Sequence, residues 1–385
     1  MIILGTVTLR CSRIEGANSK MIFKYKIIKS SNELKEYESV WKKLETGKEM
    51  TAFQSYDWNV LLVEQWLKFA YNRLLSDICI AEVIENNNTV MLFPLIVQKK
   101  SLGIKWLGRK RGIYFLGIES WSDYMNAIYS EFNNLWFDFA FKEIAKQFPG
   151  LDINLNCVRD DTAISIWCTK KGFQDRLTTS VFIDLPESIE AYNQKLSKST
   201  RQNLRTALNR MKKDNYEYEF SICSNIESDE IINNLCDIHT KRTKVKNKKS
   251  KEKLDLLHYY SKIWHACYVD WHDRKYDIIK NSMKRMSNSI FVIVKLNDVI
   301  VGYLYGLIDN RAIRVMQNCF KMEYAFYSPL FRGTYDFLIK QIQNYSKNIM
   351  QIDFTRCDEA YKYKLGGDEM QLHNYVIKDG EIELR

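Results

Sequence analysis

Reactive side chains gather in one run near the C-terminal end, which reads Ile352-Asp353-Phe354-Thr355-Arg356-Cys357-Asp358-Glu359-Ala360-Tyr361-Lys362-Tyr363-Lys364. Apolar and polar residues alternate at its start, as they do at the end of a strand, and the polar residues that follow predict a short helix. In open α/β sheets the carboxyl ends of strands point functional groups into a crevice where ligands bind. We therefore expect a site at this run, with a surface helix of mixed charge as the alternative.

Hydrophobic periodicity predicts helices and strands in alternation on either side of this run. The predicted strands cover residues 78–84, 90–98, 104–107, 113–116, 151–156, 180–185, 216–222, 289–296, 299–308, 312–319 and 350–354. The predicted helices cover 33–44, 56–69, 131–147, 162–171, 189–213, 229–243, 254–286 and 329–345. Both halves show the same order of elements, which predicts a duplicated α/β unit. The expected ranges are an N-terminal extension 1–20, a first module 21–186 and a second module 187–385.

The net charge of +10 arises locally. Two segments, 191–213 and 241–251, carry fourteen of the 57 bases and no acid, so that the remaining 43 bases are outnumbered by 47 acids. An anionic ligand is therefore expected near those two segments, although a lysine run is often only a solvated surface.

Cysteine, histidine and apolar patterns exclude several classes of protein. Neither the 9 cysteines nor the 5 histidines have the spacing of a metal site, and scattered cysteines are typical of buried thiols in a reducing compartment. The first ten residues lack the leading positive charge of a secretory signal, and the most apolar window elsewhere is far too short to span a bilayer. The sequence therefore predicts a cytoplasmic protein without a metal or a transmembrane segment.

The order of elements and four landmarks resemble the tandem GNAT fold, in particular a two-domain acetyltransferase-like family found with cellulose and other polysaccharide biosynthesis genes and related to the Fem-type aminoacyltransferases. The landmarks are residues 51–58 (Thr51 to Trp58), Ser122-Asp123-Tyr124, Ile183 to Pro186 leading into Leu196 to Arg205, and Asp353-Phe354 followed by Asp358 to Lys362. Together they span almost the whole chain after Met21. The resemblance implies an α/β fold of two mixed-sheet modules, the first degenerate and on the acceptor side, the second carrying the donor site.

The resemblance also implies a donor and its binding site. In a GNAT unit the pyrophosphate of an acyl carrier rests on backbone N–H groups at the start of the helix that follows the fourth strand. Acetyl-CoA or another acyl-CoA is the expected donor substrate. The residues expected to bind it are Ser328, Arg332, Gly333 and Thr334, with Ser328 as the N-cap and Arg332 reaching a phosphate.

Acyl transfer needs a base, a donor for the developing oxyanion and a proton for the leaving thiolate. The expected bases are Asp353 and Glu359, Tyr361 is the expected proton donor, and a strand N–H between residues 315 and 318 is expected to meet the oxyanion. The residues expected to bind or shape the site of a glycan-precursor acceptor are Asp123, Tyr124, His239, Arg356, Asp358 and Lys362. For each of these residues a structural role is the competing interpretation.

Two departures from the family pattern concern glycine. Relatives usually have glycine where this chain has Cys357, so the turn after the strand is expected to differ. Relatives also place a glycine early in the turn after Ser328-Pro329, whereas the first one here is Gly333.

The expected activity is transfer of an acyl group to an amine or hydroxyl of an amino sugar or another cell-surface precursor. The first alternative is a Fem-like transferase whose donor is aminoacyl-tRNA, with the basic segments on its phosphates. Against it stands the lack of a heptad-patterned helical arm. The second alternative is a GNAT-like protein without activity that binds an anionic polymer or a partner.

Overall fold

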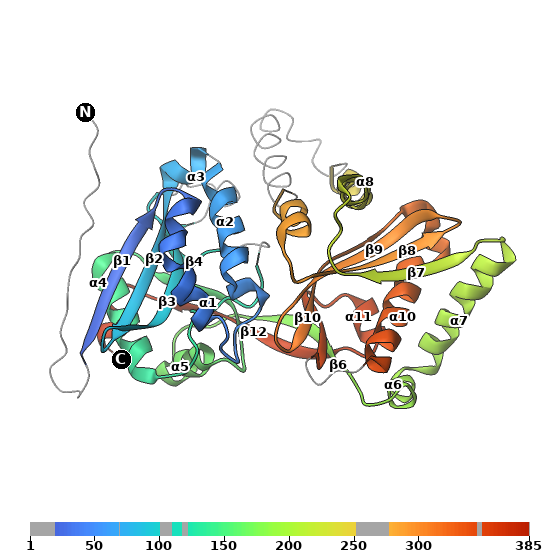
Figure 1. Ribbon diagram of the computed structural model, residues 1–385. Coiled ribbons are helices and arrows are strands. Elements are labelled where there is room, and N and C mark those ends of the chain that lie inside the picture. The colour runs from blue at the N-terminus through green and yellow to red at the C-terminus, as the bar shows by residue number, and fades with distance from the viewer. Residues whose placement is uncertain are drawn as a thin grey trace. The chain divides into compact units, whose positions relative to one another are not determined.

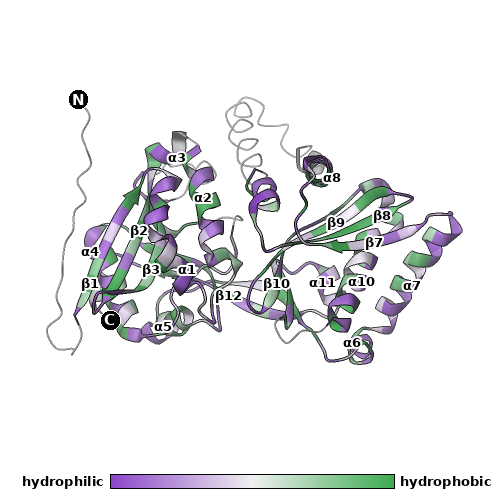
Figure 2. Cartoon of the chain, viewed as in Figure 1, coloured by the Kyte–Doolittle hydropathy of each residue, from purple (hydrophilic) through white to green (hydrophobic). Residues whose placement is uncertain are grey.

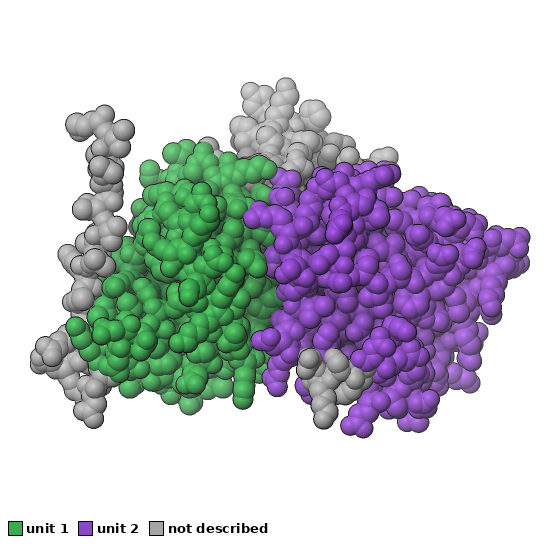
Figure 3. All heavy atoms as spheres, in the orientation of Figure 1, with its two compact units in different colours: residues 1–178, 371–385 green, residues 179–370 purple. Residues whose placement is uncertain are grey.

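The computed structural model describes residues 20–68, 70–100, 110–117, 122–251, 277–344 and 349–384 of the chain (Figure 1). It divides into two compact units, which Figure 3 colours separately. Unit 1 comprises Met1–Thr178 and Gln371–Arg385, and unit 2 comprises Thr179–Met370. The expected extension 1–20 and the expected strand 104–107 lie outside the described residues, apart from Lys20.

Unit 1 is a mixed sheet with helices packed on it, its strands in the order β1-β2-β3-β4-β5-β12. The strands are β1 Met21–Ile28, β2 Ser76–Glu85, β3 Asn88–Gln98, β4 Gly112–Phe115, β5 Ile153–Arg159 and β12 Asp368–Ile377. The helices are η1 Ser31–Tyr37, α1 Glu38–Leu44, η2 Ala52–Gln54, α2 Tyr56–Lys68, α3 Ala70–Leu75, α4 Asn134–Gln147, α5 Ala163–Lys171 and α12 Glu381–Leu384. Strand β12 starts in unit 2 and enters unit 1 at Gln371, where it pairs antiparallel with β5.

The strands of unit 2 run in the order β6-β11-β10-β9-β8-β7 and include both parallel and antiparallel pairs. The strands are β6 Leu177–Asp184, β7 Tyr218–Cys223, β8 Ser289–Leu296, β9 Val299–Ile308, β10 Ala312–Phe320 and β11 Gln351–Arg356. The helices are α6 Ile189–Lys195, α7 Lys198–Lys213, α8 Asp229–Lys251, η4 Met322–Tyr327, α10 Pro329–Gln343 and α11 Ala360–Lys364, and residues 277–285 are also helical.

Both hairpins that the sequence predicts form around polar residues with left-handed backbone. Asn86 and Asn87 join β2 to β3 with φ of 49° and 65°, and Asn297 and Asp298 join β8 to β9 with φ of 47° and 64°. A two-residue hairpin of this twist needs positive φ at both central positions, and Asn and Asp tolerate it. These two turns fix the register of four of the strands.

One apolar core fills the space between the unit 2 sheet and helices α7 and α10. Ile290, Leu304 and Ile352 from the sheet meet Phe337 of α10 and Leu204 of α7 in this cluster, and each of them is buried. Figure 2 shows hydrophobic colour on β8 and β9 and mostly hydrophilic colour on α7, as expected for buried strands beside an amphipathic helix.

The fold class expected from the sequence, α/β with two mixed-sheet modules, is confirmed. The compact units divide the chain differently from the expected ranges, because the boundary falls at residue 178 and residues 371–385 belong to unit 1 through the pairing of β12 with β5. The helix expected over 189–213 is two helices, α6 and α7, since Leu196 adopts an extended backbone and Ser197 caps a new helix. Strands β1 and β12 have no counterpart among the expected ranges.

Within the described residues, no helix is both long and apolar enough to cross a bilayer. The same residues contain no group of three or more His, Cys, Asp or Glu side chains arranged to hold a metal ion.

Candidate functional site

Parallel strands β10 and β11 pair over a short length and then separate. Their register covers only Ala312 to Arg314 of β10, opposite Gln351 to Asp353 of β11. From Val315 to Phe320, β10 pairs with β9 alone among the described strands. One edge of β10 and the turn after β11 therefore flank an opening in the sheet, which we call the wedge.

Backbone irregularities at one level explain why the two strands part there. The register of β10 against β9 shifts between Val315 and Gln317, and that of β11 against β6 shifts between Asp353 and Arg356. Thr355, within the second shift, has φ of 57°, so the regular strand conformation of β11 is interrupted there. Its hydroxyl donates to the carbonyl oxygen of Val315 at 3.1 Å and so closes the base of the wedge. Bulges bend strands and re-aim their groups, and they are common beside active sites.

A buried ion-pair network fixes the last paired residues above the wedge. The Arg314 guanidinium donates to Asp309 Oδ2 at 2.7 Å and also pairs with Asp353. The second oxygen of Asp353 accepts the backbone N–H of Thr355 at 2.7 Å, and Asp353 has no exposed surface. These contacts give Asp353 a structural role, because a carboxylate so enclosed is not available to an acceptor amine.

Tyr361 lies on α11 at the mouth of the wedge and meets Asn318 of β10. The Asn318 side-chain amide donates to the Tyr361 phenol oxygen. Burial raises the pKa of the Tyr361 phenol above its ordinary value; the hydrogen bond from Asn318 and the nearby Arg242 guanidinium act in the opposite direction. Because the phenol oxygen accepts this bond, its own proton is free to be donated elsewhere.

The turn between β11 and α11 is held by a lysine. The Lys362 ammonium lies 2.9 Å from the carbonyl oxygen of Phe354, 2.8 Å from that of Arg356 and 2.9 Å from that of Cys357. It also pairs at 2.8 Å with Glu359, whose side chain is 56% exposed. Lys362 is therefore buried in the turn and positions α11, whereas Glu359 offers a carboxylate to solvent.

Cys357 occupies this turn with φ of 77°, in the left-handed region that favours glycine. The turn was expected to differ from one with glycine at this position, yet its backbone has a conformation that glycine adopts readily. Arg356, half-buried, and Asp358, exposed, flank it in the same turn.

The start of α10 arranges the four expected donor residues differently from a simple phosphate site. Ser328 has φ of 49° and its side chain makes no cap hydrogen bond. Arg332 forms an ion pair with Asp336 one turn later. Gly333 and Thr334 face the sheet: a Cβ on Gly333 would lie 2.4 Å from Val294 Cγ2, and Thr334 is 1% exposed. The donors left for an anion are backbone N–H groups of the first helical turn.

Two expected acceptor residues lie in unit 1. Tyr124 is 2% exposed, its ring centroid is 6.1 Å from that of Phe53, and its carbonyl oxygen accepts the Gln54 side-chain amide at 2.8 Å. Asp123 beside it is half-buried. Tyr124 thus belongs to the core of unit 1.

Helix α8 carries a third expected acceptor residue, His239, which is half-buried. Arg242, one turn further on, lies with its guanidinium 4.5 Å from the Phe320 ring centroid and 3.9 Å from Cys319 Sγ. Arg242 therefore borders the end of β10, next to the Asn318 that binds Tyr361.

The structure brings Asp353, Glu359, Tyr361, Arg356, Asp358 and Lys362 together at the end of β11, as their closeness in sequence predicts. The side-chain roles of Asn318 and Thr355 were not expected, although Asn318 ends the stretch expected to supply an oxyanion N–H and Thr355 lies within the expected site run. Nothing in their sequence neighbourhood marks a strand bulge, so no local pattern would have identified them.

No protein-family model matches the chain, and no curated protein matches it. Among solved structures, a conserved protein of unknown function from Bacteroides thetaiotaomicron VPI-5482 is 11% identical, with a TM-score of 0.53 over 90% of this chain and 97% of that one. FemX is 11% identical with a TM-score of 0.48 over 94% and 99%, and a tandem GNAT protein from the clavulanic acid biosynthesis pathway is 10% identical with a TM-score of 0.44 over 93% and 99%. The first likeness shows a shared fold and nothing of activity.

Proposed function

We propose that unit 2 is an acyltransferase that takes the acyl group from acyl-CoA, or from another carrier-bound thioester, at the wedge between β10 and β11. The observation that carries the proposal is the separation of two parallel strands beneath a tyrosine that holds an available proton. A strand edge without a partner strand offers backbone donors and acceptors to an extended, amide-containing chain, which would add to the sheet as a further strand.

The residues of the wedge supply the groups that the reaction requires. The bulge at Val315 to Gln317 re-aims strand N–H groups, and one of them would donate to the thioester carbonyl as negative charge develops on its oxygen. A carbon–nitrogen bond forms, the carbon–sulfur bond breaks, and the Tyr361 proton passes to the leaving sulfur. The proton lost by the acceptor amine goes to Glu359, the exposed carboxylate near Tyr361.

The donor's diphosphate would rest at the N-terminal turn of α10, where backbone N–H groups lack intrahelical partners. Arg332 would reach it only by leaving Asp336, so we assign the backbone the larger share of binding. The acceptor we propose is the amine of an amino sugar or a related precursor of a cell-surface polysaccharide.

Contacts of the first basic segment count against aminoacyl-tRNA as the donor. Lys195 pairs with Asp368 at 2.6 Å, Arg201 donates to two backbone carbonyl oxygens, and Arg210 donates to the Phe326 carbonyl oxygen. Bases used within the protein are poor candidates for phosphate contacts, because each would have to give up a partner. In the second basic segment, the side chains after residue 243 lie outside the described residues.

The test is direct binding of acetyl-CoA and of aminoacyl-tRNA at two salt concentrations, together with release of free thiol from acetyl-CoA when glucosamine is added. We expect acetyl-CoA to bind with a dissociation constant below about 1 mM, the upper end of ordinary KM values. Because only a few phosphates are involved, we expect this binding to weaken little with salt. The proposal is wrong if acetyl-CoA fails to bind while tRNA binds with a steep salt dependence.

A further inference from the structure

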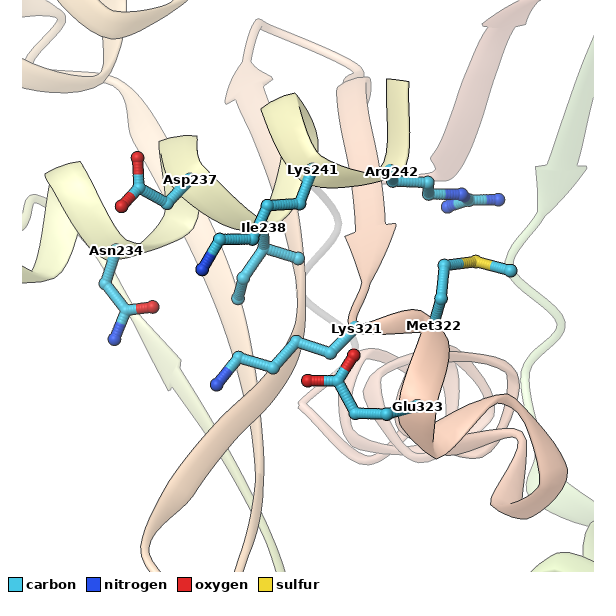
Figure 4. Close-up of a pocket in the computed structure, with 8 residues that line it drawn as sticks. All are labelled: Asn234, Asp237, Ile238, Lys241, Arg242, Lys321, Met322 and Glu323. Carbon is cyan, nitrogen blue, oxygen red and sulfur yellow. The ribbon is translucent and has the colours of Figure 1, made fainter. Parts of the chain in front are cut away.

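A pocket in unit 2 borders the residues that follow β10 and is not among the sites described above. It has a volume of about 210 Å³ and lies between α8 and the residues that follow β10. The residues that contribute charge, amide or apolar surface to it are Asn234, Asp237, Ile238, Lys241, Arg242, Lys321, Met322 and Glu323 (Figure 4). This space equals roughly seven water molecules at liquid density, which suits a small molecule or a single head group.

Charged groups of both signs line this pocket without being paired to each other. Within the described part of the chain, no ion pair or side-chain hydrogen bond engages the following four side chains: Asp237, Lys241, Lys321 and Glu323. Figure 4 shows the ammonium groups of Lys241 and Lys321 extending toward the same side of the pocket, with Glu323 beside Lys321. The ammonium groups of Lys241 and Lys321 repel each other across this space, and within the described residues neither is paired with Asp237 or Glu323, so an anionic group that reaches both lysines is favoured there.

Arg242 joins this pocket to the reaction site. It lines the pocket, contacts Cys319 and Phe320 at the end of β10, and lies close enough to Tyr361 to act on its pKa. Arg242 therefore links the pocket to the end of β10, close to the Asn318 that meets Tyr361. In Figure 4 the Arg242 guanidinium extends to the opposite side from the ammonium groups of the two lysines. An acceptor that spans the pocket from the two lysines to Arg242 would approach the end of β10, where the donor thioester is proposed to lie.

We propose that this pocket is the acceptor subsite, and that the acceptor is a small amine which also carries a carboxylate or a phosphate. The proposal rests on the acyltransferase function proposed above. Lys241 and Lys321 bind the anionic group, and Glu323 attracts the ammonium form of the amine. The ammonium gives one proton to solvent to become the neutral nucleophile, and its second proton goes to Glu359 as the carbon–nitrogen bond forms. An acceptor with an amine but no anion leaves the two lysines unmatched and binds more weakly.

Calorimetric binding of four sugar probes to the full chain tests this proposal. Glucosamine carries only the amine, glucose 6-phosphate carries only an anion, and glucosamine 6-phosphate and muramic acid carry both, with a phosphate and a carboxylate respectively. We expect the two probes with both groups to bind more tightly than the other two. The stronger of those two shows which anion the pocket prefers.

Three variants and a matched control locate the binding. Lys241→Gln and Lys321→Gln should each weaken the probes with both groups by about fivefold and leave glucosamine nearly unchanged. Glu323→Gln should remove the preference for glucosamine 6-phosphate over glucose 6-phosphate. Lys213→Gln, at an exposed lysine near the end of α7 that does not line the pocket, should change none of these affinities.

The subsite is refuted if glucosamine and its 6-phosphate bind equally, if no probe binds, or if Lys213→Gln has the same effect as the pocket variants. It is also refuted if Lys241→Gln and Lys321→Gln weaken acetyl-CoA instead of the probes, because the lysines would then serve the donor. In each case intact acetyl-CoA binding leaves the proposed function standing, whereas loss of donor binding in the unchanged protein removes the function itself.

Discussion

Tyr361 is the residue on which the proposed chemistry depends. Its phenol oxygen accepts from Asn318, and its pKa is raised by burial, so the phenol stays protonated well above neutral pH. Tyr361→Phe should lower the rate of acyl transfer by about 10² to 10⁴, the range for loss of a positioned acid, and should leave the affinity for acetyl-CoA unchanged. Single-turnover rates and calorimetry measure the two effects separately.

Tyr363→Phe is the matched control, because Tyr363 lies on the same short helix and bonds to Glu369 instead of β10. A similar loss of rate in both variants would show that α11 as a whole, and not the Tyr361 proton, is what matters.

The pH dependence of the transfer step follows from the same group. Tyr361 acts as an acid only while protonated, and a raised pKa moves its loss of activity to higher pH. We expect no decline attributable to Tyr361 between about pH 7 and pH 10, because its pKa lies above the ordinary value of a phenol. A decline centred near pH 8 in the wild type that is absent from Tyr361→Phe would contradict the raised pKa.

Asp353 was expected to act as a base, and its contacts in the structure favour a structural role instead. It lies fully buried against Arg314 and the Thr355 N–H, so Asp353→Asn removes one charge of a buried pair. We expect the free energy of unfolding to fall by about 3 kcal/mol, with acetyl-CoA turnover per folded molecule retained. Urea unfolding and active-site-normalised rates check this. An unchanged stability with abolished turnover would restore Asp353 as the base.

Cys357 has a left-handed backbone conformation, which is less favourable for any residue with a Cβ than for glycine. Cys357→Gly relieves a positive φ of 77° in the turn that carries the site, and should raise the free energy of unfolding by about 1 kcal/mol. Cys357→Ala keeps the Cβ and removes only the thiol, so it should give no such gain. Equal effects of the two substitutions in denaturant titrations would mean that the thiol, not the backbone, is responsible.

At the scale of single elements, the close packing of helix α10 on β8 depends on a glycine. A Cβ on Gly333 would lie 2.4 Å from Val294 Cγ2 of β8, so Gly333→Ala must push the helix or the valine aside. We expect a loss of about 1 to 3 kcal/mol in unfolding free energy and weaker acetyl-CoA binding as the helix start moves.

Val294→Ala is the test partner for that substitution, since it removes the methyl group that the new Cβ would meet. The double variant should recover most of the lost acetyl-CoA affinity even though Val294→Ala alone leaves a cavity. Losses that simply add in the double variant would exclude the steric explanation.

Element by element, local patterns in the sequence were enough for hairpins, amphipathic helices and most strands. The polar pairs at Asn86 and at Asn297 predict their turns because few other residues adopt positive φ. The wedge could not be predicted in this way, because it depends on two bulges that lie at the same level in different strands. The bulges meet where Thr355 bonds to Val315, which is 40 residues earlier in the sequence. The side chains of the site run were predicted as a group, but which of them is buried, paired or available depends on partners such as Arg314 and Asn318 from another strand.

At the scale of the whole molecule, we expect a substitution to destabilise the unit that its side chain packs in, whatever its place in the sequence. Tyr375 of β12 is 1% exposed and its hydroxyl lies 2.8 Å from Ser165 Oγ and 2.9 Å from Thr169 Oγ1, both on α5. Tyr375→Ala should destabilise unit 1 by about 3 to 5 kcal/mol. Hydrogen exchange should therefore quicken at residues such as those of β5, far earlier in the chain.

Phe337→Ala, at a fully buried position of α10, is the counterpart in unit 2. Its effect should be confined to amides of unit 2, and that of Tyr375→Ala should be greatest in unit 1. If both substitutions quicken exchange equally everywhere, the two units unfold as one cooperative body.

The crossing of β12 into unit 1 has a consequence during protein synthesis. A ribosome makes residues 1–178 first, yet the strand that pairs with β5 comes only after all of residues 179–370 have been polymerised. Until then the nascent first unit carries an uncovered edge on β5, which is a template for misdirected pairing. We therefore expect the nascent chain to bind chaperones until residue 377 has been synthesised and β12 can pair with β5.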